Sequence, residues 1–494
     1  MTRKEFLRLA AIGTPALGVH AGAQSHPPVR KPATGVTKAV TAFIMSTRID
    51  AFPQRAIVEA KRCLVDGFGV ILAGATVRGS AIVREYVRAA GAAEQSTVLG
   101  PDTLTIDAAH AALANAASGH AMDYDDTQLS STPDRVFGLL THPTVPALAA
   151  SLAIGERLGA SGRTFLEAFL VGFEVECKIA EAIDPDHYLR GFHSTGTVGT
   201  FGAAASAAKL LKLAPTSVAH ALGIAASMAS GIRVNFGSMT KPLHAGRAAA
   251  NGIVAAELAS RGFTAGDDGL DGEWGFFRVF GGGADVARIV PALGQPPSIV
   301  DPGVSFKPYP CGSLGHQAMD AMLKLVTDHD VKPEQIGRIR VRAGTNILNP
   351  LRYKTARTEL EAKFCLPFMM SVIALRRRAG IREFTDEYVS SAPVQAMMAK
   401  VETVLDPQIE ARGFDKMRSV IDVELTDGRK LSQPSDERYR GGPERPFTRA
   451  ELHEKFTDCA SLVLPPDRIR RALDAIETIE TMSSIRDLVA ALRA

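Results

Sequence analysis

The chain has 494 residues, of which 46% are hydrophobic and 22% are charged, and its formal net charge is +3. A chain of this size can bury a large core and is expected to divide into two or three domains. Because its charges nearly balance and no Lys/Arg block stands out, the sequence excludes the broad basic surface of a nucleic-acid-binding protein, and any anion that it binds is expected to be small.

The first 36 residues differ from the rest of the chain. Arg3 and Lys4 precede a short apolar stretch at residues 9–19, and the A-G-A at residues 21–23 has the form of a signal cleavage site. This pattern predicts a twin-arginine-like export signal with lysine in the second arginine position, and therefore a periplasmic protein. The apolar stretch is too short to anchor the chain in a membrane. The alternative is an unprocessed extension on a cytoplasmic protein.

From residue 37 the sequence predicts helices, because apolar residues recur at steps of three and four in segments rich in Ala and Leu. These segments are residues 56–73, 110–120, 146–158, 165–182 and 200–211. Many of them are apolar almost all round and contain Ala and Gly, so they are expected to be buried and to approach one another closely. Charged residues interrupt every apolar run before it is long enough to span a membrane.

The helical pattern ends at five prolines within residues 296–310, which predict a domain boundary. Beyond it, apolar and charged residues alternate at 336–342 and 419–425, as in half-buried strands, and residues 426–429 have the composition of a turn. We therefore expect a mainly α protein. Its predicted parts are a signal peptide and linker at residues 1–36, a large all-helical domain at 37–303, a smaller α+β lid domain at 304–446, and C-terminal helices at 447–494 that pack on the helical domain.

Two polar clusters in the helical part contain candidate site residues. Residues 120–127 hold three carboxylates within four positions, which repel one another unless cations or donors lie nearby, and T-H-P follows at 141–143. Residues 191–197 place a histidine and hydroxyls before a predicted helix, where free N–H groups form an anion seat. Taken alone, the first cluster is also explained as a solvated loop that caps a helix, and the second as a cap with a structural histidine.

Two further clusters are basic. Lys241, His244 and Arg247 lie at steps of three, and a helix that begins just after Lys241 would place the other two on one face, which suits carboxylate binding. Near the predicted boundary, two prolines hold Lys307 in an extended stretch that could reach into an interdomain cleft. The alternatives are separate surface residues for the first cluster and a plain hinge linker for the second.

Together, these motifs resemble the MmgE/PrpD superfamily, which includes 2-methylcitrate dehydratases, cis-aconitate decarboxylases and some epimerases of related acids. The resemblance extends from about residue 37 to the C-terminus. It is carried by H-x-M-D-Y-D-D-T at residues 120–127, T-H-P at 141–143, G-F-H-x-T-G-T at 191–197, M-T-K-P-L-H-x-G-R-A at 239–248, R-G-F-T at 261–264 and F-K-P-Y-P-C-G at 306–312.

The resemblance implies an active site made from matching positions of the decarboxylase branch. These positions are Asp123, Thr127, His142, His193, Lys241 and Lys307. A lid tyrosine also belongs to that site, and here counting along the chain points to Tyr353, whereas the local pattern points to an aliphatic residue near Leu348. The loop at residues 128–140 is longer than in the decarboxylase pattern, and because it borders the site it leaves the identity of the substrate open.

The mechanism implied by this set is proton transfer. We expect Lys241, Lys307 and His193 to hold substrate carboxylates and to stabilise the carbanion-like charge that forms when a proton leaves the neighbouring carbon. His142 is the expected general acid/base, with Asp123 as the group that orients or polarises it. The other expected substrate contacts are Thr127, His244, Arg247 and Tyr353.

Dehydration of a 2-methylcitrate-like hydroxy acid is the reaction expected first, while decarboxylation of a cis-aconitate-like acid and epimerisation stay open because they share the intermediate. A non-catalytic carboxylate-binding protein and an inactive helical dimer also stay open. The histidines lack metal-ligand spacing and the five cysteines are scattered without a CxxC pair, so we expect buried thiols and neither a metal nor a cofactor. The expected partner is a small polycarboxylate, with no nucleic acid or membrane, and the resemblance implies a homodimer.

Overall fold

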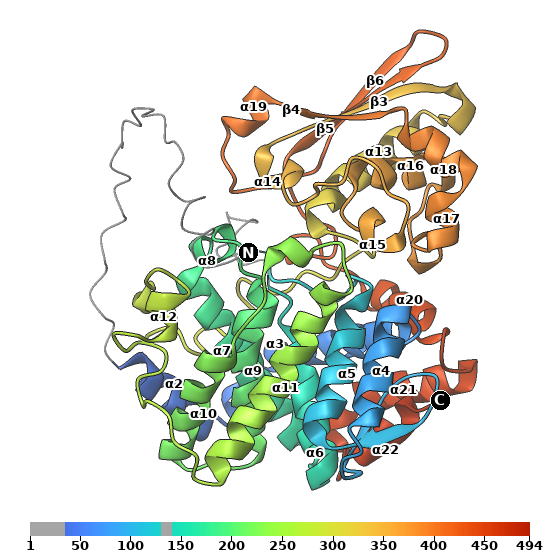
Figure 1. The fold of residues 1–494 in the computed structure, drawn as a ribbon. Helices are drawn as coiled ribbons and strands as arrows, with labels where there is room; N and C mark the ends of the chain where they lie inside the picture. Colours follow the sequence, from blue (N-terminus) through green and yellow to red (C-terminus); the bar gives the residue numbers. More distant parts are fainter. Residues whose placement is uncertain (1–34, 130–140) are drawn as a thin grey trace, which may run out of the picture. The chain divides into compact units, whose positions relative to one another are not determined.

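The computed structural model describes residues 35–129 and 141–494, and its first part is almost entirely helical (Figure 1). Its helices are α2 (Val36–Ser46), α3 (Gln54–Gly74), α4 (Arg78–Ala89), α5 (Ala108–Ala121), α6 (Thr144–Leu158), α7 (Gly162–Ile183), α8 (Asp186–Leu189), α9 (Ser194–Leu210), α10 (Pro215–Met228), α11 (Thr240–Ser260) and α12 (Phe276–Val279). Strands β1 (Ser96–Val98) and β2 (Leu104–Ile106) form an antiparallel pair between α4 and α5. The five helices predicted from apolar spacing appear as α3, α5, α6, α7 and α9, and the mainly α class is confirmed.

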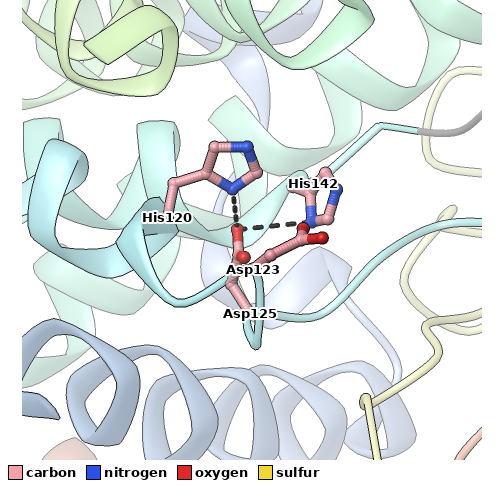
Figure 2. A group of neighbouring side chains, drawn as sticks. All are labelled: His120, Asp123, Asp125 and His142. Carbon is pink, nitrogen blue, oxygen red and sulfur yellow. Dashed lines mark hydrogen bonds and ion pairs between the residues drawn. The ribbon is translucent and has the colours of Figure 1, made fainter. Parts of the chain in front are cut away.

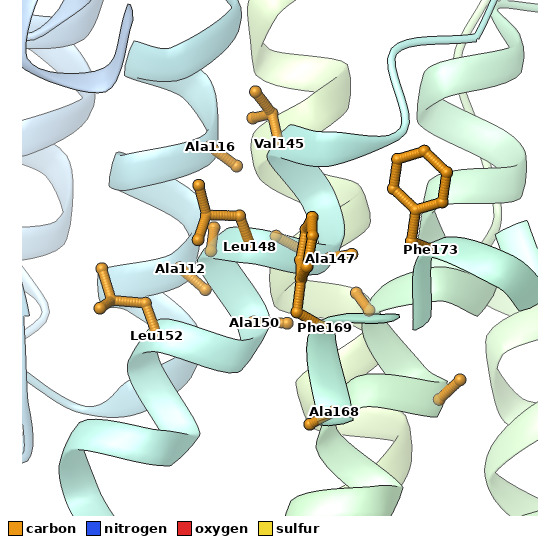
Figure 3. Packing of buried hydrophobic residues seen from close by; sticks show 14 of the residues in the cluster. Ala112, Ala116, Val145, Ala147, Leu148, Ala150, Leu152, Ala168, Phe169 and Phe173 are labelled. Carbon is orange, nitrogen blue, oxygen red and sulfur yellow. The ribbon is translucent and has the colours of Figure 1, made fainter. Parts of the chain in front are cut away.

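Small residues let α11 lie close against α5 and α9. A Cβ atom added to Gly252 of α11 would lie 2.5 Å from the Cβ of Ala203 and 2.5 Å from the backbone nitrogen of Ala204, both in α9. Figure 3 shows alanine and leucine side chains of α5 and α6 packed beside Phe169 and Phe173 of α7. The close packing of buried helices that the composition predicts is therefore present.

Replacing Gly252 by alanine is expected to lower the free energy of unfolding by roughly 1–3 kcal/mol, because the new methyl group meets backbone atoms that cannot move aside. Urea unfolding of the two proteins measures the difference. Gly380→Ala is the matched control, since a Cβ atom there would come no closer than 3.5 Å to a described atom. An unchanged urea midpoint for Gly252→Ala would contradict the close approach of α9 and α11.

The chain between residues 316 and 434 adds a four-stranded sheet and further helices. These elements are α13 (His316–Asp328), β3 (Ile336–Ala343), α14 (Thr345–Leu348), α15 (Glu359–Ala362), α16 (Leu366–Arg376), α17 (Asp386–Ser390), α18 (Ala392–Met398), β4 (Val401–Leu405), α19 (Pro407–Glu410), β5 (Ser419–Leu425) and β6 (Lys430–Pro434). The strand order is β4-β3-β5-β6, with β3 parallel to β4 and antiparallel to β5. Alternate residues of β3 and β5 are buried in a second hydrophobic cluster together with α13 and α16. Both predicted strands are confirmed, whereas β4 and β6 were not predicted.

The last helices, α20 (Arg449–Ala460), α21 (Pro466–Glu477) and α22 (Arg486–Leu492), return to the first hydrophobic cluster. Helices α20 and α21 contact α3, and Phe456 of α20 lies 3.2 Å from where a Cβ atom of Gly69 would be. The described residues form one compact unit. The boundaries predicted after residues 303 and 446, and the lid role of the part between them, therefore stay predictions.

Two predicted features lie outside the described residues. They are the export signal with its linker, apart from residues 35 and 36, and most of the long loop at residues 128–140. Within 35–129 and 141–494, every helix is too short or too polar to cross a bilayer. The five cysteines are buried, as predicted.

Candidate active site

The loop that follows α5 is tied to two segments that are distant in the sequence. Thr127 and Ser305 exchange backbone hydrogen bonds of 2.9 Å in both directions, and the N–H of Gln128 donates to the carbonyl oxygen of Thr141. These bridges bring the D-Y-D-D-T loop, the T-H-P motif and the F-K-P-Y-P motif to one small cavity. Asp123 in this loop has a left-handed backbone, with φ of 50°, which is uncommon for a residue other than glycine and often marks a functional position.

Asp123 contacts two lysines from opposite parts of the chain. Its Oδ1 atom lies 2.8 Å from Nζ of Lys241 and 2.7 Å from Nζ of Lys307. The two lysines are 4% and 1% exposed. Burial raises the pKa of Asp123, but the two ammonium groups outweigh burial and hold this pKa below its ordinary value. Burial lowers the pKa of Lys241 against the opposing effect of Asp123. The two lysines thus meet at a single carboxylate oxygen in the cavity.

His142 pairs with Asp125 rather than with Asp123. Figure 2 shows Oδ2 of Asp125 between two imidazoles, 2.8 Å from Nδ1 of His120 and 3.3 Å from Nδ1 of His142. Burial raises the pKa of Asp125, but the two imidazoles outweigh it and hold that pKa well below its ordinary value. Burial also lowers the pKa of His120 to about 3 and lowers that of His142. Asp123 is engaged by the lysines, so the described contact that would orient His142 comes from Asp125, and the orienting role expected of Asp123 stays a prediction.

His193 stands directly before α9 and is 1% exposed. Its Nδ1 atom lies 3.0 Å from Nδ1 of His244, and its Nε2 atom meets no hydrogen-bond partner among the described residues. Burial, and after it the charge of Lys241, hold the pKa of His193 well below its ordinary value. The hydroxyl of Thr195 accepts a hydrogen bond of 3.1 Å from the backbone N–H of His142, which joins the two motifs. Of residues 191–197, His193 is the one that lines the cavity.

Six of the nine predicted site residues line this cavity. They are Asp123, Thr127, His142, His193, Lys241 and Lys307. His244 reaches the cavity through its contact with His193. Tyr188, Phe236 and Phe364 also line the cavity but were not predicted, because isolated aromatic residues look the same in sequence whether they face a core or a site. Burial raises the pKa of Tyr188 to about 12, so its hydroxyl stays protonated.

Arg247 and Tyr353 do not line the cavity. Arg247 lies six positions after Lys241, which turns α11 by about 600°, so Arg247 points roughly 120° away from Lys241 and is exposed. The ring of Tyr353 packs against Gly237, where a Cβ atom would lie 2.6 Å from its hydroxyl oxygen. Leu348, the other position considered, packs against the second hydrophobic cluster. The cavity lining therefore gives no support to the substrate contacts predicted for Arg247 and Tyr353.

Four cavity-side residues have the donor types of a metal site. His120, Asp123, Asp125 and His142 offer ligand atoms that all lie within 4.8 Å of one another. This donor set does not suit a divalent cation, because Nζ of Lys241 already lies 2.9 Å from Nε2 of His120 and 2.8 Å from Asp123. The ammonium group of Lys241 would repel a metal cation placed among these ligand atoms, and burial strengthens that repulsion. A site without metal remains the prediction.

Comparison with known proteins supports the reading of the motifs. A family model described as the MmgE/PrpD N-terminal domain matches residues 38–289, and one described as the MmgE/PrpD C-terminal domain matches residues 309–481. Cis-aconitate decarboxylase of Homo sapiens is 28% identical over 469 residues, which cover 93% of this chain and 94% of that protein. The Mus musculus protein of the same name is 27% identical over 471 residues, covering 93% of each chain. That of Aspergillus terreus (strain NIH 2624 / FGSC A1156) is 24% identical over 486 residues, covering 92% of this chain and 95% of the other.

Proposed function

Because this chain belongs to the MmgE/PrpD family, we propose that it is a cofactor-independent lyase that removes carbon dioxide from a small polycarboxylate resembling cis-aconitate. The observation that carries the proposal is the buried cavity in which Lys241 and Lys307 share one oxygen of Asp123, with His142 in the same lining. Cations in such a water-poor space bind carboxylates and stabilise developing negative charge more strongly than they would in water. The three relatives named above, aligned over at least 92% of both chains, support decarboxylation ahead of the dehydration expected from the sequence.

The two lysines have different tasks in this proposal. Nζ of Lys241 contacts Oδ1 of Asp123 and Nε2 of His120, which leaves a third N–H for a substrate carboxylate. Nζ of Lys307 contacts both Oδ1 and the backbone oxygen of Asp123, and also the backbone oxygen of Cys311. Its three N–H groups are already in use. We therefore assign direct substrate binding to Lys241 and stabilisation through its positive charge to Lys307.

Decarboxylation breaks the bond between the carbon skeleton and the departing carboxylate, which leaves as carbon dioxide. The electron pair of that bond becomes negative charge delocalised toward a remaining carboxylate, and the charges of Lys241 and Lys307 lower the energy of this state. Protonated His142 then donates its proton to carbon, and the neutral imidazole regains one from solvent. The reaction consumes one proton for each molecule of carbon dioxide released.

Dehydration of a 2-methylcitrate-like hydroxy acid is the second candidate, because the loop at residues 128–140, longer than the decarboxylase pattern has, leaves the identity of the substrate open. Here neutral His142 would remove a proton from the carbon next to a carboxylate, and the hydroxyl group would take up a proton from the imidazolium so formed and leave as water. Epimerisation would use the same removal and return the proton to the opposite face. These reactions need His142 to be neutral at the start, whereas decarboxylation needs it protonated.

The pH dependence of kcat/KM separates these reactions. Burial depresses the pKa of His142 in the free protein, so its protonated fraction falls as the pH rises. For decarboxylation we therefore expect kcat/KM to decrease between about pH 6 and about pH 8, where the carboxylates of the substrate stay ionised. Initial rates across this range provide the measurement. A kcat/KM that stays flat or increases with pH would contradict proton donation by His142 and favour dehydration or epimerisation.

Incubation of the full chain with cis-aconitate, 2-methylcitrate and citrate in D2O, followed by NMR, tests the proposed function directly. Loss of carbon dioxide from cis-aconitate, with one deuterium in the product, is the expected result. Formation of an unsaturated acid from 2-methylcitrate would establish the second candidate instead. If none of the three acids is converted although one of them binds, the protein is a carboxylate-binding protein and the proposal fails.

A further inference from the structure

One carboxylate oxygen is shared by two histidines beside the cavity. Oδ2 of Asp125 lies 2.8 Å from Nδ1 of His120 and 3.3 Å from Nδ1 of His142, and the two rings stand edge to face with their centroids 4.5 Å apart (Figure 2). Asp125 is completely buried. An ionised carboxylate can only accept hydrogen bonds, so Nδ1 of His120 has to carry the hydrogen in its 2.8 Å bond to Asp125. Nδ1 of His142 makes no hydrogen bond to a described residue, but it lies at ion-pair distance from the same oxygen, whose negative charge favours a hydrogen on that nitrogen.

The tautomer of each ring decides what its other nitrogen can do. Nε2 of His120 keeps a lone pair, and it lies 2.9 Å from Nζ of Lys241, which can donate to it. His142 lines the cavity, and because its Nδ1 faces Asp125 at 3.3 Å, its Nε2 is the nitrogen left to deliver a proton. The same carboxylate thus sets the protonation pattern of His142 and, through His120, the orientation of Lys241.

We propose that Asp125 is the positioning residue of this site, because it holds His120 and His142 with their Nδ1–H groups toward itself and stabilises the imidazolium of His142 when that cation forms. The inference rests on the proposed function, since a reaction that uses a proton from His142 gives the imidazolium its role. The other titratable or charged groups around His142 are Asp123, Lys241, Lys307, His120 and His193. Among the described residues, Asp125 is the acidic group in contact with a ring nitrogen of His142.

Asp125→Asn tests this role because it keeps the shape of the side chain and removes its charge. We expect kcat to fall roughly 10²-fold with a smaller change in KM, since asparagine stabilises an imidazolium less well than a carboxylate does. The loss of kcat/KM with rising pH should also move to lower pH. A role that is merely structural would not shift the pH profile.

Asp126→Asn is the matched control. Asp126 is the next residue of the same loop and is equally buried, but it accepts a hydrogen bond of 2.5 Å from Thr144 and contacts neither histidine. Burial, and after it the charge of Asp66, raise the pKa of Asp126 well above its ordinary value, so we expect the loss of its charge to cost little. Thermal unfolding of both variants shows whether they are folded, and we expect Asp126→Asn to keep the kcat and pH profile of the wild type.

NMR of protein labelled with 15N-histidine decides the inference without any turnover. In the unliganded wild type, His120 and His142 should both show the Nδ1–H tautomer, with signals assigned through His120→Gln and His142→Gln. An Nε2–H tautomer at either residue overturns the inference, and so does a folded Asp125→Asn protein with an unshifted pH profile. If the wild type converts no acid, the proposed function fails, while the tautomers still test whether Asp125 holds both rings.

Discussion

Replacing His142 with glutamine is expected to lower kcat by roughly 10²- to 10⁴-fold, because an amide of similar size cannot deliver a proton near neutral pH. KM should change much less, since Lys241 and His193 still face the cavity. The remaining activity should no longer decrease with rising pH in the way expected of the wild type. Initial rates with the substrate found in the NMR experiment, measured over the same pH range, provide the comparison.

His187→Gln is the matched control for this substitution. His187 is buried like His142, but its Nε2 lies 2.7 Å from the hydroxyl of Thr197 and its ring does not line the cavity. Its loss should leave the pH profile unchanged in protein that remains folded. A His142→Gln protein that keeps more than about a tenth of the wild-type kcat would rule out general acid/base catalysis by His142.

Replacing Lys241 with methionine is expected to lower kcat/KM by roughly 10²- to 10³-fold, because a buried donor that faces the developing charge is removed. Both constants should change. KM rises since Lys241 has an N–H left for the substrate carboxylate, and kcat falls since its charge stabilises the transition state. Asp123 keeps its contact with Lys307, so the loop need not unfold.

Lys178→Met is the control for the loss of a buried lysine as such. Nζ of Lys178 lies 3.0 Å from Glu181 in α7, and neither residue lines the cavity. The control should lose stability but keep kcat/KM for the folded fraction, which circular dichroism and thermal unfolding monitor. An equal loss of activity in both lysine variants would show that the effect of Lys241 comes from folding rather than from substrate binding.

Much of the fold could be predicted from periodicity. The five helices between residues 56 and 211 were predicted because apolar residues recur in them every three to four positions. Strands β3 and β5 were predicted because apolar residues recur in them every two positions. Strands β4 and β6 were missed because their residues are partly or fully exposed on both faces, so neither carries a buried alternation. Periodicity does not show where one domain ends and the next begins. The described residues pack into one compact unit, so the predicted domain ends have no counterpart in a gap between units.

The motifs also predicted most of the cavity, because their resemblance to the MmgE/PrpD superfamily implied which positions line the site. Arg247 shows the limit of that reasoning. Arg247 lies three positions after His244, which is compatible with a shared helix face. The side of α11 that faces the cavity does not include Arg247, however, and its side chain points to solvent. Tyr188 shows the opposite limit, since it lines the cavity without belonging to any of the motifs.

The amino-acid sequence by itself determined which chemical groups this protein can bring to a site, since the helical pattern and the order of the polar motifs are written along the chain. Only the tertiary structure decided how those groups pair. Asp123 and Asp125 are two residues apart and chemically identical, yet one contacts two ammonium groups and the other two imidazoles. The backbone turn at Asp123, with φ of 50°, and the bridges to Ser305 and Thr141 set those directions, and such contacts between distant segments have no signature in local sequence.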